Sequence, residues 1–165
     1  MDGLEPKEEK NTKLELRHLV NDLQKIVESY RRQNRIIDYL TKNLETPLED
    51  KGKLGQIEKK TDGIEGALKQ LVEEYEIIVD VDKVLERVNS VKRRENLGAY
   101  MKIFERMERH IKDEKDRNKA LFAQLPRTIN VAMTKAQTAL FSYMIYLYRR
   151  CDIFNTDLDK LLGKG

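Results

Sequence analysis

A seven-residue repeat of large apolar side chains near the start of the chain constrains its fold more than any other feature. One register holds Leu16, Leu23, Tyr30, Ile37 and Leu44, and the position three residues later holds Leu19, Ile26 and Leu40, with Gln33 as its polar exception. Such a stripe marks one face of a long helix, and it needs a companion because a single helix of this kind is unstable in water. We therefore expect a long coiled-coil helix over residues 13–46.

A second run with the same spacing follows a short break. Pro47, Gly52 and Gly55 predict a turn over residues 47–56. The seam of the second coiled-coil helix consists of Ile57, Ile64, Leu71, Ile78 and Leu85. The β-branched stretch 77–81 leaves a local break open, but the spacing continues through it and favours one helix over residues 57–88.

Over residues 89–165 we expect shorter helices that belong to a helical bundle or to the start of a helical rod. Apolar residues from Leu97 to Ile111 follow a three-four spacing, and those from Phe122 to Leu147 form a broader face. Residues 112–118 are almost wholly charged and indicate a helix end or a solvated connection, whereas residues 1–12 are polar and predict a disordered lead-in. The predicted fold class is all-α, with long N-terminal coiled-coil helices followed by shorter ones.

Composition and motifs argue against several classes of function. Charged residues make up 37% of the chain, but 32 basic and 29 acidic residues nearly balance, so nucleic acid is not an expected partner. His18 and His110 lack metal-ligand spacing, and no phosphate-binding glycine loop or nucleophile motif is found. We expect a chain that is no enzyme, with no catalytic residue, metal or cofactor. The single Cys151 and the polar N-terminus predict a cytoplasmic protein.

Five segments resemble, in order and spacing, the N-terminal region of the seventy-kilodalton exocyst subunit family. They are IIDYL at 36–40, DGIEGALKQL at 62–71, VDKVL at 81–85, LGAYM at 97–101 and YMIYL at 143–147. The resemblance implies a helical assembly segment that pairs with other exocyst-type subunits in the complex that tethers secretory vesicles to the plasma membrane. It also implies a peripheral location at sites of secretion, with membrane or small-GTPase contacts made by regions outside this segment.

The sequence leaves open what covers the first stripe. The first stripe is either the partner-helix interface or the inner face of a hairpin with residues 57–88, and the stripe is wide enough for both arrangements. Two other functions also remain open, a membrane-surface helical dimer module that would need a strong basic face, and a generic coiled-coil adaptor.

Aromatic and basic clusters are the remaining candidates for binding. The tyrosines at 143, 146 and 148 beside Arg149 and Arg150 indicate either a membrane-interface or aromatic binding surface or, more simply, a helix at the border of core and solvent. The basic clusters at 31–35 and 92–94 stand among acidic residues, which favours solvated helix faces over phosphate contacts.

Overall fold

In a computed structural model of the protein, all regular secondary structure of the described residues is helical. The described residues are 6–45, 54–78, 81–94, 96–128 and 133–161, and their side chains are described at 12–43, 62–78, 81, 83–94, 96–125 and 133–150. These residues form five helices, α1 (Pro6–Glu45), α2 (Leu54–Ile78), α3 (Val81–Arg94), α4 (Ala99–Thr128) and α5 (Lys135–Leu161). The predicted all-α class is confirmed.

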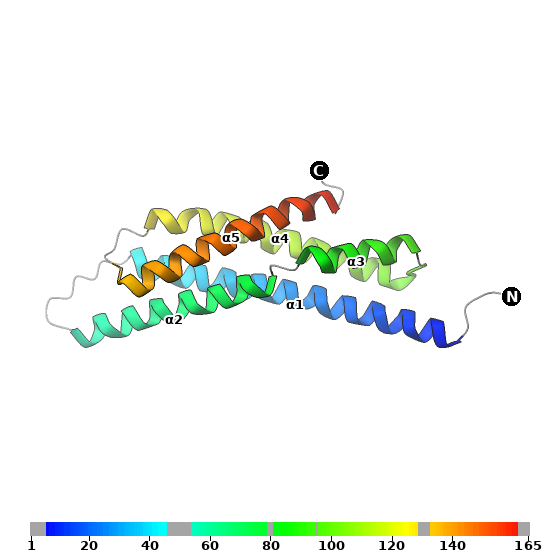
Figure 1. Ribbon diagram of the computed structural model, residues 1–165, viewed down its shortest axis with the longest axis horizontal. Helices are drawn as coiled ribbons and strands as arrows, with labels where there is room; N and C mark the ends of the chain where they lie inside the picture. The colour runs from blue at the N-terminus through cyan, green and yellow to red at the C-terminus, as the bar shows by residue number, and fades with distance from the viewer. Residues whose placement is uncertain (1–5, 46–53, 79–80, 95, 129–132, 162–165) are drawn as a thin grey trace.

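The helices lie side by side along one long axis (Figure 1). α1 is the longest, with 40 residues, and α2 and then α3 return beside it in the opposite direction (Figure 1). α4 runs in the same direction as α1, and α5 returns beside α2 (Figure 1). The most extensive packing joins α1 to α4, followed by α2 to α5 and α1 to α2. α1 is therefore covered by neighbours from its own chain along much of its length.

Ion pairs show the antiparallel register between α1 and α3. Arg94 lies 3.5 Å from Glu15, and Arg87 lies 3.6 Å from Asp22, so a later position on α1 meets an earlier one on α3. Each pair is largely exposed and contributes at most about 1 kcal/mol. The register is therefore set mainly by the apolar stripes beneath these pairs.

The apolar stripes of all five helices meet in a single core. Among its largest fully buried side chains are Leu19 and Leu23 of α1, Tyr75 of α2 and Phe104 of α4. Removing one such side chain from water stabilises the fold by roughly 1.5–3 kcal/mol. This burial is what holds a set of highly charged helices together.

Two local signals fix where α4 and α5 begin. Gly98 has a φ of 56°, a left-handed conformation that favours glycine, and the turn around it is closed by the amide of Tyr100, which donates to the carbonyl of Leu97 at 3.0 Å. At α5, Thr134 and Gln137 form a capping box, because each side-chain oxygen accepts a hydrogen bond at 3.1 Å from the backbone amide of the other. The capping box satisfies two amides that would otherwise lack acceptors.

The structure corrects two boundaries in the N-terminal half. α1 already begins at Pro6, so residues 6–12 are helical and do not belong to a disordered lead-in, while residues 1–5 lie outside the described part. The single helix predicted over residues 57–88 is instead two helices, since α2 ends at Ile78 and α3 begins at Val81. The β-branched stretch coincides with this boundary, and the seven-residue spacing continues across it because Ile78 and Leu85 are both buried.

The C-terminal half also differs from the sequence-based expectation. The charged residues 112–118 are no helix end but lie in the middle of α4, where Lys115 and Asn118 face the core and Asp113, for example, faces solvent. Phe122 and Leu125 consequently end α4 and do not begin the next helix. With 30 and 27 residues, α4 and α5 are longer than α2, with 25, so the later helices are not the shorter ones.

Candidate functional site

The first stripe, a candidate for the partner-helix interface, is buried inside this chain. Relative exposure is at most 6% for seven of its members, Leu16, Leu19, Leu23, Ile26, Tyr30, Ile37 and Leu40, and the side chain of Leu44 lies outside the described residues. In the second seam, Ile64, Leu71, Ile78 and Leu85 are buried as well, and the side chain of Ile57 is not described. The described side chains of the two seams therefore belong to the internal core, and they are not exposed to a partner.

A layer of hydrogen-bonded polar side chains crosses this core at the level of Gln33. Asn118 of α4 donates to the side-chain oxygens of Gln33, at 3.1 Å, and Asn34, at 3.0 Å. It also accepts a hydrogen bond of 3.3 Å from the hydroxyl of Tyr75. Because buried polar groups need partners, this layer favours one register of α1, α2 and α4 over shifted ones. Gln33, the polar exception in the first stripe, marks this layer in the sequence, but its partners follow only from the packing of the helices.

Glu74 of α2 extends the polar layer to the surface. Its carboxylate accepts a hydrogen bond from the Arg32 guanidinium at 2.6 Å and another from the Ser29 hydroxyl at 2.6 Å. The hydrogen bond to Glu74 raises the pKa of Arg32 above its ordinary value. The side chain of Glu74 is only 14% exposed, so this pair is better shielded than the other ion pairs of α1. It locks α1 to α2 at one end of an open groove.

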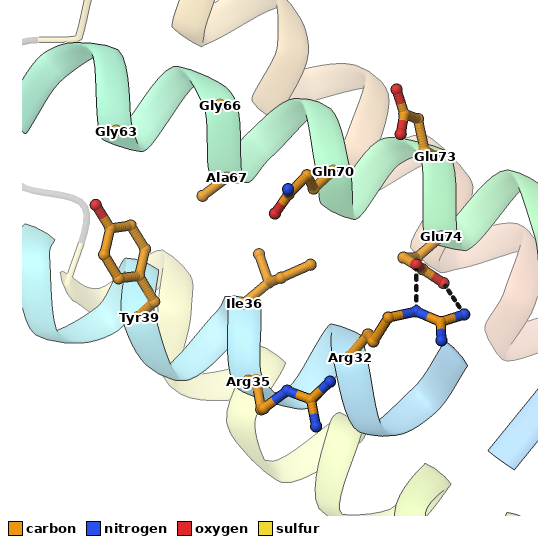
Figure 2. Close-up of a pocket in the computed structure, with 10 residues that line it drawn as sticks. All are labelled: Arg32, Arg35, Ile36, Tyr39, Gly63, Gly66, Ala67, Gln70, Glu73 and Glu74. Atoms are coloured by element: carbon orange, nitrogen blue, oxygen red, sulfur yellow. Dashed lines mark hydrogen bonds and ion pairs between the residues drawn. The ribbon is translucent and has the colours of Figure 1, made fainter. Parts of the chain in front are cut away.

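The groove lies between α1 and α2 and measures about 650 Å³ (Figure 2). From α1, Ile36 and Tyr39 point toward α2, and from α2, Gly66, Ala67 and Gln70 border the space opposite them (Figure 2). A volume of this size is typical of sites that hold a small molecule or a few side chains. Its mixture of apolar and charged walls suits a peptide or helix better than a purely apolar ligand.

Two glycines of α2 shape the groove in different ways. At Gly63, a methyl group would lie 2.5 Å from the hydroxyl oxygen of Tyr39, so the glycine permits that hydroxyl to approach the α2 backbone. At Gly66, a methyl group would meet no heavy atom within 4 Å. The absence of a side chain there leaves the α2 backbone open to an approaching group.

Most of the basic side chains in the two predicted clusters are neutralised by acids. Arg31 lies 3.4 Å from Glu114, Arg32 is bound by Glu74, and Lys92 is paired with Glu108. Within the described part of the chain, Arg35 has no hydrogen bond or ion pair. The geometry therefore favours solvated, paired helix faces over a phosphate-binding surface.

α5 exposes an uncharged face that has no counterpart in the charged helices around it. Positions 136–148 contain no Asp, Glu, Lys or Arg, and the exposed ones are Ala136, Thr138, Ala139, Ser142, Tyr143 and Tyr146. Tyr143 is 43% and Tyr146 is 53% exposed, and Ile77 of α2, at 61%, is the most exposed large apolar side chain among the described residues. We name the α5 set the α5 face.

The tyrosines of the α5 face are held by polar neighbours. The Tyr143 hydroxyl donates to Glu76 at 2.9 Å, and this hydrogen bond raises the pKa of Tyr143. The guanidinium carbon of Arg150 lies 5.8 Å from the centre of the Tyr146 ring, within the range of a cation–π contact. The predicted third member, Tyr148, belongs to the core border instead, since its ring stacks on Phe122 with centroids 3.7 Å apart.

The described residues hold no group of three or more His, Cys, Asp and Glu side chains arranged to bind a metal ion. None of the helices, as far as they are described, is long and apolar enough to cross a membrane. Comparison with models of known protein families, with curated proteins and with solved structures found no match.

Proposed function

We propose that this chain is a non-catalytic helical assembly module that binds partner helices through the α5 face. The observation that carries the proposal is that the six exposed positions of α5 from Ala136 to Tyr146 carry no charge, in a chain of which 37% is charged. The buried centres of protein interfaces are depleted in charged residues and enriched in tyrosine. A face used only for contact with water would have no reason to avoid the Lys and Glu found on the other helices.

The shape of the α5 face supports a helix as its ligand. The N-terminal half of the face carries the small side chains of Ala136, Ala139 and Ser142, so another helix can approach it closely. The other half carries Tyr143 and Tyr146, which supply large, rigid contact areas. Because the Tyr143 hydroxyl donates to Glu76, it offers a partner only its acceptor oxygen. A partner helix that crosses α5 can thus pack on the small residues and be anchored by the tyrosines.

The five family-like segments support a placement of this module in a vesicle-tethering complex of the exocyst type. In this proposal its partners are helices of other exocyst-type subunits, and it acts in the cytoplasm at sites of secretion on the plasma membrane. The seven-residue spacing of buried positions further supports a helical bundle with coiled-coil packing. Because α1 is covered by its own chain, the proposal assigns the contact with partners to α5 and not to α1.

A binding experiment with two charge-matched variants tests the proposal. The purified chain is titrated with the N-terminal helical segments of the other exocyst-type subunits from the same source, and binding is followed by calorimetry. We expect Tyr146→Glu to weaken binding by about tenfold or more, as at an aromatic anchor. Gln124→Glu, which adds the same charge on the exposed side of α4, should leave binding unchanged.

Two results would contradict the proposal. In the first, none of the segments binds, or the two variants bind them equally well. In the second, the chain sediments with anionic vesicles in a salt-sensitive manner, which would point to the membrane-surface module instead.

A further inference from the structure

The α5 face is followed at both ends by positive charge. The charged residues at positions 133–150 are Lys135 before the face and Arg149 and Arg150 after it, and all three are exposed. Lys135 and Arg149 make no hydrogen bond or ion pair within the described part of the chain, and Arg150 contacts the ring of Tyr146. α5 thus presents an uncharged face with cations at each end and no acid of its own over these positions.

The acid that contacts the face does not balance the charge at its ends. Glu76 of α2 lies beside Tyr143, and its carboxylate accepts the hydrogen bond of the Tyr143 hydroxyl at 2.9 Å. Tyr143 is about 12 Å from Lys135 and about 9 Å from Arg149 along the helix axis. Exposed charges farther apart than about 8 Å are largely screened at physiological salt, so both ends remain positive to an approaching partner.

The exposed positions of α5 have the spacing of a coiled-coil seam. Lys135, Ala139, Ser142, Tyr146 and Arg149 are exposed and follow one another in alternating steps of four and three residues. This spacing fits a second helix that lies along α5. The two ends of the seam are about 21 Å apart, so one partner helix of about four turns reaches both.

A second copy of this chain does not fit the seam. In an antiparallel pair of α5 helices, Lys135 of one copy meets Arg149 of the other, and in a parallel pair each cation meets its own equivalent. Both arrangements bring like charges together, which disfavours association. The charges at the ends therefore favour a helix of different sequence that carries acids.

A lipid surface is also a poorer occupant than a helix. Helices that lie on membranes bury a broad apolar side with large residues such as Trp, Phe and Leu. The α5 face offers only two large side chains, Tyr143 and Tyr146, and its other positions are Ala, Ser or Thr. Small side chains suit the close approach of another helix better than insertion among lipids.

We propose that the partner of the α5 face is a helix of different sequence that lies along α5 and carries an acidic residue at each end of a seam two heptads long. One carboxylate pairs with Lys135 and the other with Arg149, while the seam between them packs on Ala139, Ser142 and Tyr146. This inference rests on the function proposed above and names the chemistry of the partner.

Two stapled helical peptides test the charges at the ends of the seam. Both have the same seam of Ala and Leu in four-three steps, and the residue at each end is Glu in one peptide and Lys in the other. Each peptide is titrated into the full chain, and binding is followed by NMR through the methyl signals of Ala136 and Ala139. We expect both signals to shift with the Glu peptide. The Lys peptide should bind about tenfold more weakly or worse, because it turns two attractions into repulsions.

Two charge-matched double variants complete the test. Lys135→Glu combined with Arg149→Glu should reverse the preference, so that the Lys peptide binds better. The control combines Lys102→Glu with Arg109→Glu at exposed positions of α4, changes the net charge by the same amount, and should keep the preference for the Glu peptide. Because all four side chains are exposed, both double variants should melt close to the parent temperature.

The outcomes separate this inference from the proposed function. Equal binding of the two peptides, or an unaltered preference in the Lys135→Glu, Arg149→Glu variant, would overturn the inference while the α5 face remained a docking surface. Absence of methyl shifts with either peptide at about 1 mM, the weak end of useful affinities, would also overturn it. The proposed function would then be decided by the Tyr146→Glu titration, which does not depend on these charges.

Two further results would assign the face to another occupant and contradict the inference. The first is a dimer of the parent chain in sedimentation velocity that is lost in Tyr146→Glu, which would make a second copy the partner. The second is binding to vesicles of phosphatidylserine and phosphatidylcholine that is lost in the Lys135→Glu, Arg149→Glu variant, which would assign the charges at the ends to a lipid surface.

Discussion

Replacement of Asn118 by alanine is expected to remove the hydrogen bonds that join α4 to α1 and α2 in the core. Asn118 is 2% exposed and binds three side chains, those of Gln33, Asn34 and Tyr75, at 3.0–3.3 Å. With a net value of about 1 kcal/mol for each hydrogen bond, we expect the free energy of unfolding to fall by about 3 kcal/mol. Alanine is the better helix former, so helix propensity acts against this loss and cannot produce it.

Urea denaturation followed by helical circular dichroism measures this effect. Gln124→Ala, on the exposed side of the same helix, is the control and should change the free energy by less than about 0.5 kcal/mol. A double-mutant cycle with Gln33→Ala isolates the contact between Gln33 and Asn118, with an expected coupling of about 1 kcal/mol. A loss below about 1 kcal/mol for Asn118→Ala, with no coupling, would refute the polar layer. The substitution leaves the side-chain oxygens of Gln33 and Asn34 without this donor in the core, and two such buried acceptors should destabilise the fold by more than that.

Four further substitutions have distinct expected outcomes. Gly66→Ala should raise the free energy of unfolding by up to about 1 kcal/mol, because alanine favours the helix and its methyl group meets no neighbour. Gly98→Ala should lower the free energy of unfolding by about 1 kcal/mol or more, because Gly98 has a positive φ. Equal effects of the two substitutions in urea denaturation would contradict these backbone assignments. Glu76→Gln should lower the raised pKa of Tyr143, because the hydrogen bond to the carboxylate favours the protonated phenol and is lost as the pH rises through that pKa. An NMR titration of the Tyr143 ring carbons measures this pKa. An unchanged pKa would exclude the contact with Glu76. Leu23→Asp should destabilise the isolated chain by several kcal/mol; a variant with the parent melting temperature would show that the stripe is not buried.

The sequence was sufficient to predict which side chains are buried in the first two seams, because periodicity reports burial directly. All seven described members of the first stripe are in the core, as an apolar stripe of that length requires. Periodicity does not say which helix covers a stripe. The first stripe is covered largely by α4, and the length of α4 is hidden in the sequence because the charged residues 112–118 resemble a helix end.

The polar contacts depend on pairings that no local pattern reveals. Arg32 and Glu74 are separated by 42 positions, and Gln33 and Asn118 by 85, so their proximity follows from the packing of whole helices. By contrast, the capping box of Thr134 was readable in the sequence as Thr followed three residues later by Gln, and it marks the start of α5. The empty space at Gly66 could be seen only with Tyr39 and Ile36 placed opposite α2.

The uncharged character of the α5 face was visible in the sequence, but its exposure was not. An apolar, tyrosine-rich stretch is compatible with a buried helix as well as with a docking surface. The structure separates the two within α5, because Tyr143 and Tyr146 are exposed whereas Met144 and Leu147 are buried. The same stretch thus serves the core on one side and remains available on the other.

Hydrogen exchange of the isolated chain tests most directly whether α1 is covered by its own neighbours. If it is, the amides of residues 16–40 exchange slowly without any partner, at a rate set by global unfolding. Addition of a partner helix then changes protection on α5 and not on the middle of α1. Rapid exchange of residues 16–40 in the isolated chain, slowed only by a partner, would contradict the account and return the first stripe to an intermolecular interface.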